Sequence, residues 1–312
     1  ERLPADARIA YNAWIGLGGE VHDHIPPAPA EGWALVTDAI FGIGLQRPVT
    51  GRYAEWIKIM NDLPAPRMAI DIPSGLNADT GAIMGTPFKA THTLTFIALK
   101  PGLITLDGPD YAGSINVRKL DVDAATIVPA FGKQITPSLF KHLLKPRLHN
   151  SHKGMFGDVA IIGGAPGMTG AALLAGRAAL RHGCGRVFVG FLDDRVPAVD
   201  PIQPELMLRR PETLLEDCSV LAVGPGLGQN RHAQHLLQLA LDTDRPLVLD
   251  ADALNLLAHD AALRQQAQMR TPPTILTPHP AEAARLLNTD TTTVQADRVA
   301  AAQALAQQYQ AH

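Results

Sequence analysis

Apolar and polar residues in the first half of the chain switch between the spacing of a helix and that of a strand. Helical spacing runs over residues 4–15 and again over residues 53–63. Short apolar runs that end at turn residues predict strands at residues 20–25, 34–38, 67–71, 93–97 and 114–117. Because strands and helices alternate, we expect a mainly parallel sheet.

The same alternation returns in the second half after a break. The pattern lapses over residues 121–134, which we interpret as a linker. Helices such as the alanine-rich residues 171–182 then separate strands predicted at residues 158–162, 186–190, 220–223, 246–249 and 274–276. The chain therefore divides into two α/β domains, residues 1–128 and 129–312.

Both ends of the sequence suggest that these domains are incomplete. The chain opens on Glu1 rather than Met, and its last segment, residues 293–310, is helical by its apolar spacing. A strand would come next in this alternation, and none follows. We expect a piece of a longer protein, with unpaired sheet edges that favour association when the piece is expressed alone.

Composition narrows the class of protein. The chain is 46% hydrophobic and 18% charged, which is typical of a globular protein with ordinary cores. A net charge of -3 without a basic run argues against nucleic acid or a membrane as partner. The two cysteines, Cys184 and Cys218, are too few for a disulfide framework. Together with the lack of an apolar stretch of about 18 residues, this predicts a cytoplasmic protein.

Oxygen-bearing side chains close two strands of the first domain. Asp38 and Asp71 each end a strand, and Ser74 follows in a Pro-Ser-Gly turn. Carboxylate and hydroxyl oxygens at neighbouring strand ends suit a hard cation, although simple capping is an alternative. Lys100 lies after the next strand and could either meet a phosphate or remain a solvated surface lysine.

Two glycine-rich loops follow strands of the second domain. Residues 163–170 and 224–228 are small enough for close approach of a ligand to the backbone, and the first loop opens a helix whose free N–H groups favour an anion. Each loop alone could be a structural turn. Two at one sheet edge favour a binding site.

Polar side chains end the next two strands of that domain. Asp250 and Asp252 could hold a magnesium nucleotide or transfer a proton, and the alternative for Asp252 is a helix N-cap. His279 stands between two prolines, which favours ligand contact over core filling.

In their order, these motifs resemble the family of bacterial bifunctional NAD(P)H-hydrate repair enzymes. The resemblance covers essentially the whole chain. It is carried by Thr37-Asp-Ala-Ile-Phe-Gly-Ile-Gly-Leu45, Asp71-Ile-Pro-Ser-Gly-Leu76, Thr93-Leu-Thr-Phe96, Lys100-Pro-Gly102, His152-Lys-Gly154, Gly224-Pro-Gly-Leu-Gly228, Asp250-Ala-Asp-Ala-Leu-Asn255 and Thr277-Pro-His-Pro280.

The resemblance implies two partial domains that repair hydrated nicotinamide cofactors. Residues 1–128 would form part of a Rossmann-like, three-layer epimerase domain, which interconverts the R and S hydrates of NADH and NADPH. Residues 129–312 would form part of a ribokinase-like domain, which dehydrates the S hydrate with ADP, ATP being the alternative nucleotide, and releases AMP and phosphate. Implied cofactors are ADP, K⁺ and Mg²⁺, implied substrates are NADHX and NADPHX, and the intact protein would be a homo-oligomer.

Site residues are implied position by position. Asp71 matches the catalytic position of the epimerase, and Asp38 and Ser74 match its potassium ligands. Hydrate contacts of the epimerase match Gly42, Ile43, Gly44, Leu45, Gln46, Arg47, Pro48 and Asp71. Hydrate contacts of the dehydratase match Ala171, Gly226, Gly228 and His279.

Two family segments have no match in this chain. The Asn-Asn-Gly-Gly-Asp-Gly loop of the epimerase is missing, and the catalytic aspartate of the dehydratase is expected beyond His312. We therefore expect this chain alone to catalyse neither reaction. Two alternatives stay open: a small-molecule kinase of the ribokinase type, and a nonenzymatic nucleotide-binding scaffold.

Overall fold

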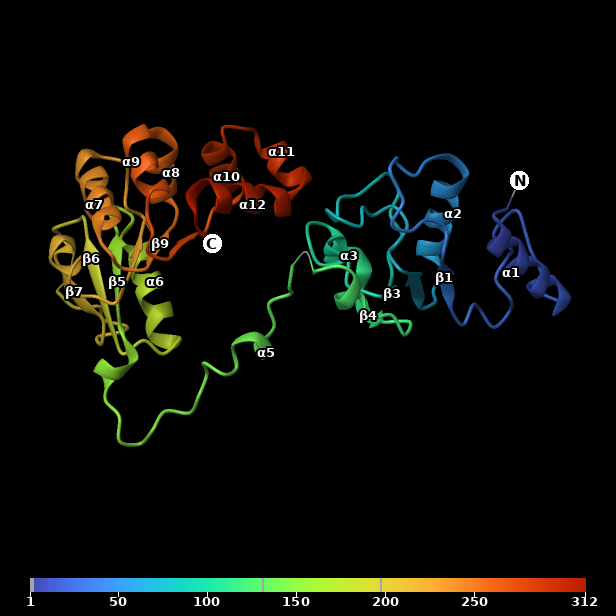
Figure 1. Cartoon of the computed structure of the whole chain (residues 1–312), viewed down its shortest axis with the longest axis horizontal. Coiled ribbons are helices and arrows are strands. Elements are labelled where there is room, and N and C mark those ends of the chain that lie inside the picture. The colour runs from blue at the N-terminus through green and yellow to red at the C-terminus, as the bar shows by residue number, and fades with distance from the viewer. Residues whose placement is uncertain (1–2, 131, 197) are drawn as a thin grey trace. The chain divides into compact units, whose positions relative to one another are not determined.

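The computed structural model describes residues 3–130, 132–196 and 198–312 and divides the chain into two compact units, Glu1–Gly132 and Lys133–His312 (Figure 1). Each unit contains one sheet in which every pair of neighbouring strands is parallel. The predicted parallel sheets are thus confirmed. A functional boundary between residues 128 and 129 stays a prediction.

The first unit places four strands in the order β1-β2-β3-β4, so their carboxyl ends share one edge. In chain order its elements are α1 (Ala5–Gly16), β1 (Val36–Asp38), α2 (Gly51–Asp62), β2 (Arg67–Ile70), β3 (His92–Phe96), a 3-10 turn (Pro101–Leu103), α3 (Gly108–Ala112), β4 (Ser114–Arg118) and α4 (Ala124–Ile127).

Helix α2 holds the first sheet through one apolar face. Ala54, Ile57 and Met60 recur every three residues and are buried against a cluster that includes Ala69 of β2 and Phe88. Ile57 has no exposed surface, and burying such a side chain contributes about 1.5–3 kcal/mol. This packing fixes β1 and β2, the two strands that carry the polar residues described below.

The strand predicted at residues 20–25 is wrong, because these residues form no ladder. Val21 is exposed, and His22 and His24 bond instead to the side chains of Glu20 and Asp23. Without an apolar face to bury, a segment gains little from joining a sheet.

The second unit places six strands in the order β10-β9-β8-β5-β6-β7, and the carboxyl ends of these parallel strands again share one edge. In chain order its elements are α5 (Pro137–Phe140), a 3-10 turn (Lys153–Phe156), β5 (Asp158–Gly163), α6 (Thr169–Arg181), β6 (Arg186–Phe191), β7 (Met207–Arg209), a 3-10 turn (Pro211–Leu214), β8 (Val220–Val223), α7 (Arg231–Asp242), β9 (Leu247–Leu249), α8 (Asp252–His259), α9 (Ala261–Gln268), β10 (Thr274–Leu276), α10 (Pro280–Leu287), α11 (Thr291–Ala296) and α12 (Arg298–Tyr309).

Two elements of this unit differ from the sequence prediction. The three-residue edge strand β7 was missed, since it is too short to show a period of two. The single helix expected over residues 293–310 is wrong, because Asp297 leaves the helical conformation and accepts a hydrogen bond from the backbone N–H of Ala300 at 2.9 Å. This N-cap starts α12 as a separate helix.

After α12 the backbone returns to the sheet beside β10. His312 donates its N–H to the carbonyl of Thr274 and accepts a bond from the N–H of Leu276, both at 2.9 Å. These two bonds give β10 a neighbour on the side opposite β9.

Candidate functional site

At the strand ends of the first unit, Asp38 and Ser74 are joined directly. Asp38 Oδ2 accepts the backbone N–H of Ser74 at 2.7 Å, and Oδ1 accepts the Ser74 hydroxyl at 2.7 Å and the N–H of Ile40 at 3.2 Å. Both side chains are buried, with 1% of each residue exposed. The structure thus brings the two expected potassium ligands together.

The Asp38 carboxylate is buried without a compensating cation among the described residues, because its hydrogen-bond donors are all neutral. Burial raises the pKa of Asp38, and the bonds from Ser74 and Ile40 offset this only in part. A monovalent cation would supply the missing charge, and carboxylate, hydroxyl and carbonyl oxygens are suitable ligands for it. The residues therefore fit a potassium ion.

Asp71 lies just beyond β2 in a backbone conformation that is rare for a side chain other than glycine, with φ of 70°. Its carboxylate forms an ion pair with Lys100, which follows β3. Oδ1 also accepts the hydroxyl of Thr95 at 3.1 Å and the backbone N–H of Phe96 at 3.2 Å. The interpretation of Lys100 as a solvated surface lysine is wrong, since its side chain is only 17% exposed and lies against Asp71. Contact with a phosphate stays a prediction.

The pairing sets the charge state of Asp71. Burial raises the pKa of Asp71, but the hydrogen bond and charge of Lys100, with the bonds from Phe96 and Thr95, outweigh this and leave the pKa below its usual value. Asp71 is therefore ionised at neutral pH. An ionised carboxylate at a strand end can act as a base.

The loop expected to contact the hydrate, residues 42–48, starts beside Ser74. Phe41 donates its N–H to the Ser74 hydroxyl at 2.9 Å, and that hydroxyl in turn donates its proton to Asp38. Leu45 packs against the core around α2, whereas Ile43 is exposed. The hydrogen bonding of Phe41 to Ser74 connects the start of the loop to Asp38. No described residue of the loop forms a hydrogen bond with Asp71.

In the second unit, the two glycine-rich loops interlock. Gly164 donates its N–H to the carbonyl of Pro225 at 3.0 Å, and Ala165 donates to the carbonyl of Gly226 at 2.6 Å. A Cβ at Gly163 would lie 2.1 Å from the Pro225 oxygen, and one at Gly226 would lie 2.7 Å from the carbonyl oxygen of Met168. Only glycine permits this close approach, so the two loops together form one continuous surface.

Three of the expected dehydratase contacts lie on this surface. Ala171 is in the first turn of α6, and a Cβ at Gly226 would meet the Ala171 methyl at 3.4 Å. Gly228 has φ of 77° and donates its N–H to Asp252 Oδ2 at 2.8 Å. The first turn of α6 and the second glycine loop are therefore neighbours.

Asp252 is not the helix N-cap that we weighed as an alternative. Helix α8 begins at Asp252, its N-cap position is Ala251, and the carboxylate bonds to the glycine loop instead. Asp250, from the preceding strand end, accepts the hydroxyl of Thr277 at 2.8 Å. Both carboxylates thus connect neighbouring strand ends.

His279 is the N-cap of α10 and is held in a capping box with Glu282. Its Nδ1 accepts the backbone N–H of Ala281 at 3.1 Å, so Nε2 carries the proton, and it lies 3.3 Å from Glu282 Oε1. The imidazole is 59% exposed, which leaves it open to a ligand. A capping histidine was not foreseen from the flanking prolines.

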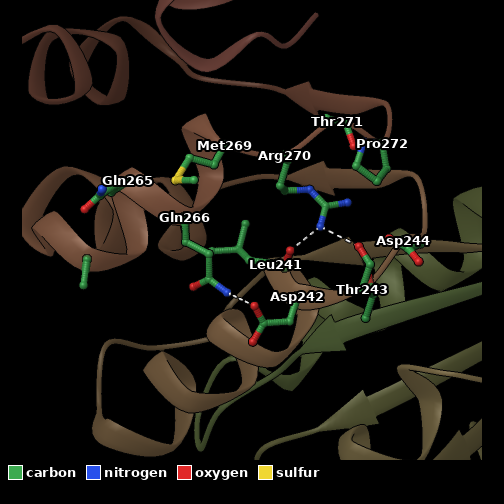
Figure 2. Close-up of a pocket in the computed structure, with 11 residues that line it drawn as sticks. Leu241, Asp242, Thr243, Asp244, Gln265, Gln266, Met269, Arg270, Thr271 and Pro272 are labelled. Carbon is green, nitrogen blue, oxygen red and sulfur yellow. Dashed lines mark hydrogen bonds between the residues drawn. The ribbon is translucent and has the colours of Figure 1, made fainter.

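The pocket drawn in Figure 2 lies at the opposite edge of the second sheet. It has a volume of about 480 Å³, and its residues come from the end of α7, from α9 and from the segment before β10. Arg270 is buried and donates to the carbonyls of Ala240, Leu241, Thr243 and Arg245 and to the hydroxyl of Thr274. Its charge therefore serves to end α7 and does not mark a catalytic site.

The described residues contain no group of three or more His, Cys, Asp and Glu side chains suited to a metal ion. A potassium site of carboxylate, hydroxyl and carbonyl oxygens would not form such a group. None of the helices in residues 3–130, 132–196 and 198–312 is long and apolar enough to cross a membrane.

Comparison with known proteins assigns a family to each half. A family described as YjeF-related protein N-terminus matches residues 1–102, and a family described as NAD(P)H-hydrate dehydratase matches residues 159–312. A solved structure of an ADP/ATP-dependent NAD(P)H-hydrate dehydratase from Bacillus subtilis, co-crystallised with ATP and Mg²⁺, has a TM-score of 0.45 and 33% identity, and the match covers 53% of this chain and 60% of that one.

Curated relatives contain both halves or the second alone. The chain is 39% identical to the bifunctional NAD(P)H-hydrate repair enzyme Nnr of Vibrio cholerae, with 99% of this chain and 63% of that protein covered. It is 50% identical to the ADP-dependent (S)-NAD(P)H-hydrate dehydratase of Neisseria meningitidis, with 52% and 56% covered. The chain spans about 60% of the length of the bifunctional relatives. By the identity and order of its halves, it belongs to the family of bifunctional NAD(P)H-hydrate repair enzymes.

Proposed function

We propose that the natural protein containing this sequence repairs hydrated NADH and NADPH. The observation that carries the proposal is the presence of two separate strand-edge sites, each in the half that matches the corresponding domain of the bifunctional relatives. The first site interconverts the R and S hydrates. The second restores NADH or NADPH from the S hydrate.

In the epimerase site, Asp71 is the base that takes and returns a proton of the hydrate. Its ionised state and its position at the end of β2 support this role. Asp38 and Ser74 hold K⁺, which neutralises the buried carboxylate and stiffens the start of the loop of residues 42–48. That loop contacts the hydrate.

In the dehydratase site, the interlocked loops and the first turn of α6 present small residues to the ligands. Ala171, Gly226, Gly228 and His279 contact the S hydrate, and a magnesium complex of ADP, with ATP as the alternative, binds at the same edge. The reaction releases AMP and phosphate when ADP is used. The activating aspartate expected beyond His312 remains a prediction.

The proposal is tested with separated epimers. The natural protein is incubated with R or S hydrate, with and without ADP, Mg²⁺ and K⁺, and recovery of NADH absorbance is followed together with the R-to-S ratio. We expect ADP-dependent recovery from S and ADP-independent interconversion of R and S. A kinase would consume nucleotide without restoring NADH, and a scaffold would bind without turnover.

The cellular setting is part of the same proposal. A cytoplasmic protein would meet damaged NADH and NADPH where they form, and the substrates are small molecules. A homo-oligomer is expected from the family resemblance and is tested by light scattering of the natural protein.

A further inference from the structure

Lys100 is tied to Asp71 in a way that assigns the two residues different tasks. The Lys100 ammonium has three N–H groups, and these go to Asp71 Oδ1, to the hydroxyl of Thr95 at 3.0 Å and to the carbonyl of Phe96 at 2.7 Å. All of its protons are thus engaged within the protein. Lys100 has no donor left to offer a substrate.

The hydrogen bonds to the Asp71 carboxylate, in contrast, reach only one of its two oxygen atoms. Lys100, Thr95 and Phe96 all donate to Oδ1, and no described residue donates to Oδ2. These three donors form a clamp on Oδ1. Since Thr95 is fully buried, the clamp belongs to the interior at the end of β3 and not to surface side chains. The carboxylate is held by one oxygen, and the other remains available.

We infer that Lys100 and Thr95 are positioning residues for the epimerase reaction: they fix Oδ1 of Asp71 and keep the carboxylate ionised, so that Oδ2 meets the proton of the hydrate. This inference rests on the proposed epimerase function. In one direction the hydroxyl proton of the hydrate passes to Oδ2 while the C–N bond at the hydroxyl-bearing carbon breaks and its C=O bond forms, and Oδ2 then passes the proton to the released nitrogen. After rotation of the carbonyl group, the nitrogen adds to the opposite face and the proton returns through Oδ2 to the oxygen, so the other epimer forms and Asp71 ends ionised as it began.

Other charged groups near this edge do not replace the clamp. Asp38 at the end of β1 and Arg118 at the end of β4 are the ionisable residues of the flanking strands, and neither forms a hydrogen bond with Asp71. Removing Lys100 would leave the carboxylate without its ion-pair partner. The pKa of Asp71 would then rise, since burial would no longer be outweighed.

The decisive variant is Lys100→Met, with Lys89→Met as a control because Lys89 is exposed on the same unit. In the natural protein, we expect kcat for epimerisation to fall about 10- to 100-fold in K100M, with little change in KM. Losses of this size are common when a residue that orients a functional side chain by a hydrogen bond is removed. The acidic limb of the pH–rate profile should also move to higher pH. Lys100→Arg should keep the limb low, because it keeps the charge.

A second pair of variants covers the case in which K100M does not fold. Thr95→Val removes the hydroxyl at nearly constant volume, whereas Thr95→Ser keeps it. T95V should reproduce the loss in kcat and T95S should restore most of the rate.

The pKa of Asp71, measured by NMR titration of the labelled carboxyl group, adds a readout independent of activity. It should rise in K100M and stay unchanged in K89M. If the pKa and the acidic limb were the same in wild type and K100M, the inference would be overturned. If the natural protein did not epimerise the hydrates at all, the proposed function would fail, while the NMR titration would still decide whether Lys100 controls Asp71.

Discussion

The two strand-edge sites of this chain are formed by different kinds of groups, side chains in the first unit and mainly backbone in the second. In the first unit, charged and hydroxyl side chains bond to one another across strand ends: Asp38 with Ser74, and Asp71 with Lys100. In the second unit, backbone groups of two glycine loops bond to each other, and Asp252 anchors one of them. A site made of side chains should be lost by removing one group, whereas a site made of backbone should be lost by adding one.

The largest effect is expected from Asp71→Ala. Epimerisation in the natural protein should fall about 100- to 10,000-fold, the usual contribution of a positioned base, while dehydration of pure S hydrate stays near normal. Each epimer is assayed separately, and Asp79→Ala, at an exposed position of the same unit, serves as the control. Equal loss of both activities would contradict the independence of the two sites.

The glycine interlock predicts the next largest effect. Gly163→Ala should lower the free energy of unfolding of the second unit by about 3 kcal/mol, because the new methyl group would meet the Pro225 carbonyl. Gly170→Ala is the matched control, since its methyl group would meet no atom within 4 Å. Urea unfolding followed by hydrogen exchange in β5 and β8 measures both variants. Equal stability would show that the loops separate freely.

His279 tests whether a capping residue also contacts the ligand. In the natural protein, His279→Ala should weaken hydrate binding by about 1–3 kcal/mol with little change in nucleotide affinity. His279→Asn keeps an N-cap and so separates loss of the cap from loss of the imidazole. Calorimetric titration with each ligand gives the answer. A loss confined to the nucleotide would exclude the substrate role.

The smallest effect concerns Asp38 and K⁺. Burial raises the pKa of Asp38, so the folded first unit favours the protonated form of this side chain. The contribution of Asp38 to the free energy of unfolding is therefore present at low pH and is lost as pH rises through the raised pKa. Potassium should offset that loss and stabilise the first unit at pH 7 by about 1.4 kcal/mol when its concentration is about ten times Kd. Thermal unfolding in KCl and in choline chloride measures this. Asp38→Asn should abolish the difference, and a K⁺ effect of equal size in the variant would contradict the site.

Much of the fold could be predicted because hydrophobic period and turn residues act locally. The strand that ends at Asp38, the strand that ends just before Asp71, and the loops of residues 163–170 and 224–228 could each be predicted from the sequence. The short strand β7 has too few residues to show a period. Residues 293–310 keep helical spacing across Asp297, so only the cap reveals the break.

The candidate sites were predictable as positions but less so as contacts. Strand ends placed Asp38, Ser74 and Asp71 at one edge, whereas the pairing of Asp71 with Lys100 joins residues 29 apart in the sequence. The left-handed backbone of Asp71 is likewise set by tertiary structure. Distance in sequence hides such pairs, since neither residue alone indicates its partner.

The hydrogen bonds of Arg270 affect how the stability of the second unit depends on salt and pH. Most ion pairs weaken when salt screens them or when acid protonates the carboxylate. Arg270 instead holds four backbone carbonyls and one hydroxyl, none of which titrates, and it lies buried at the end of α7 (Figure 2). The junction of α7 with the segments before β9 and β10 should therefore keep its hydrogen bonds in concentrated salt, which screens ion pairs such as Asp158 with Arg186.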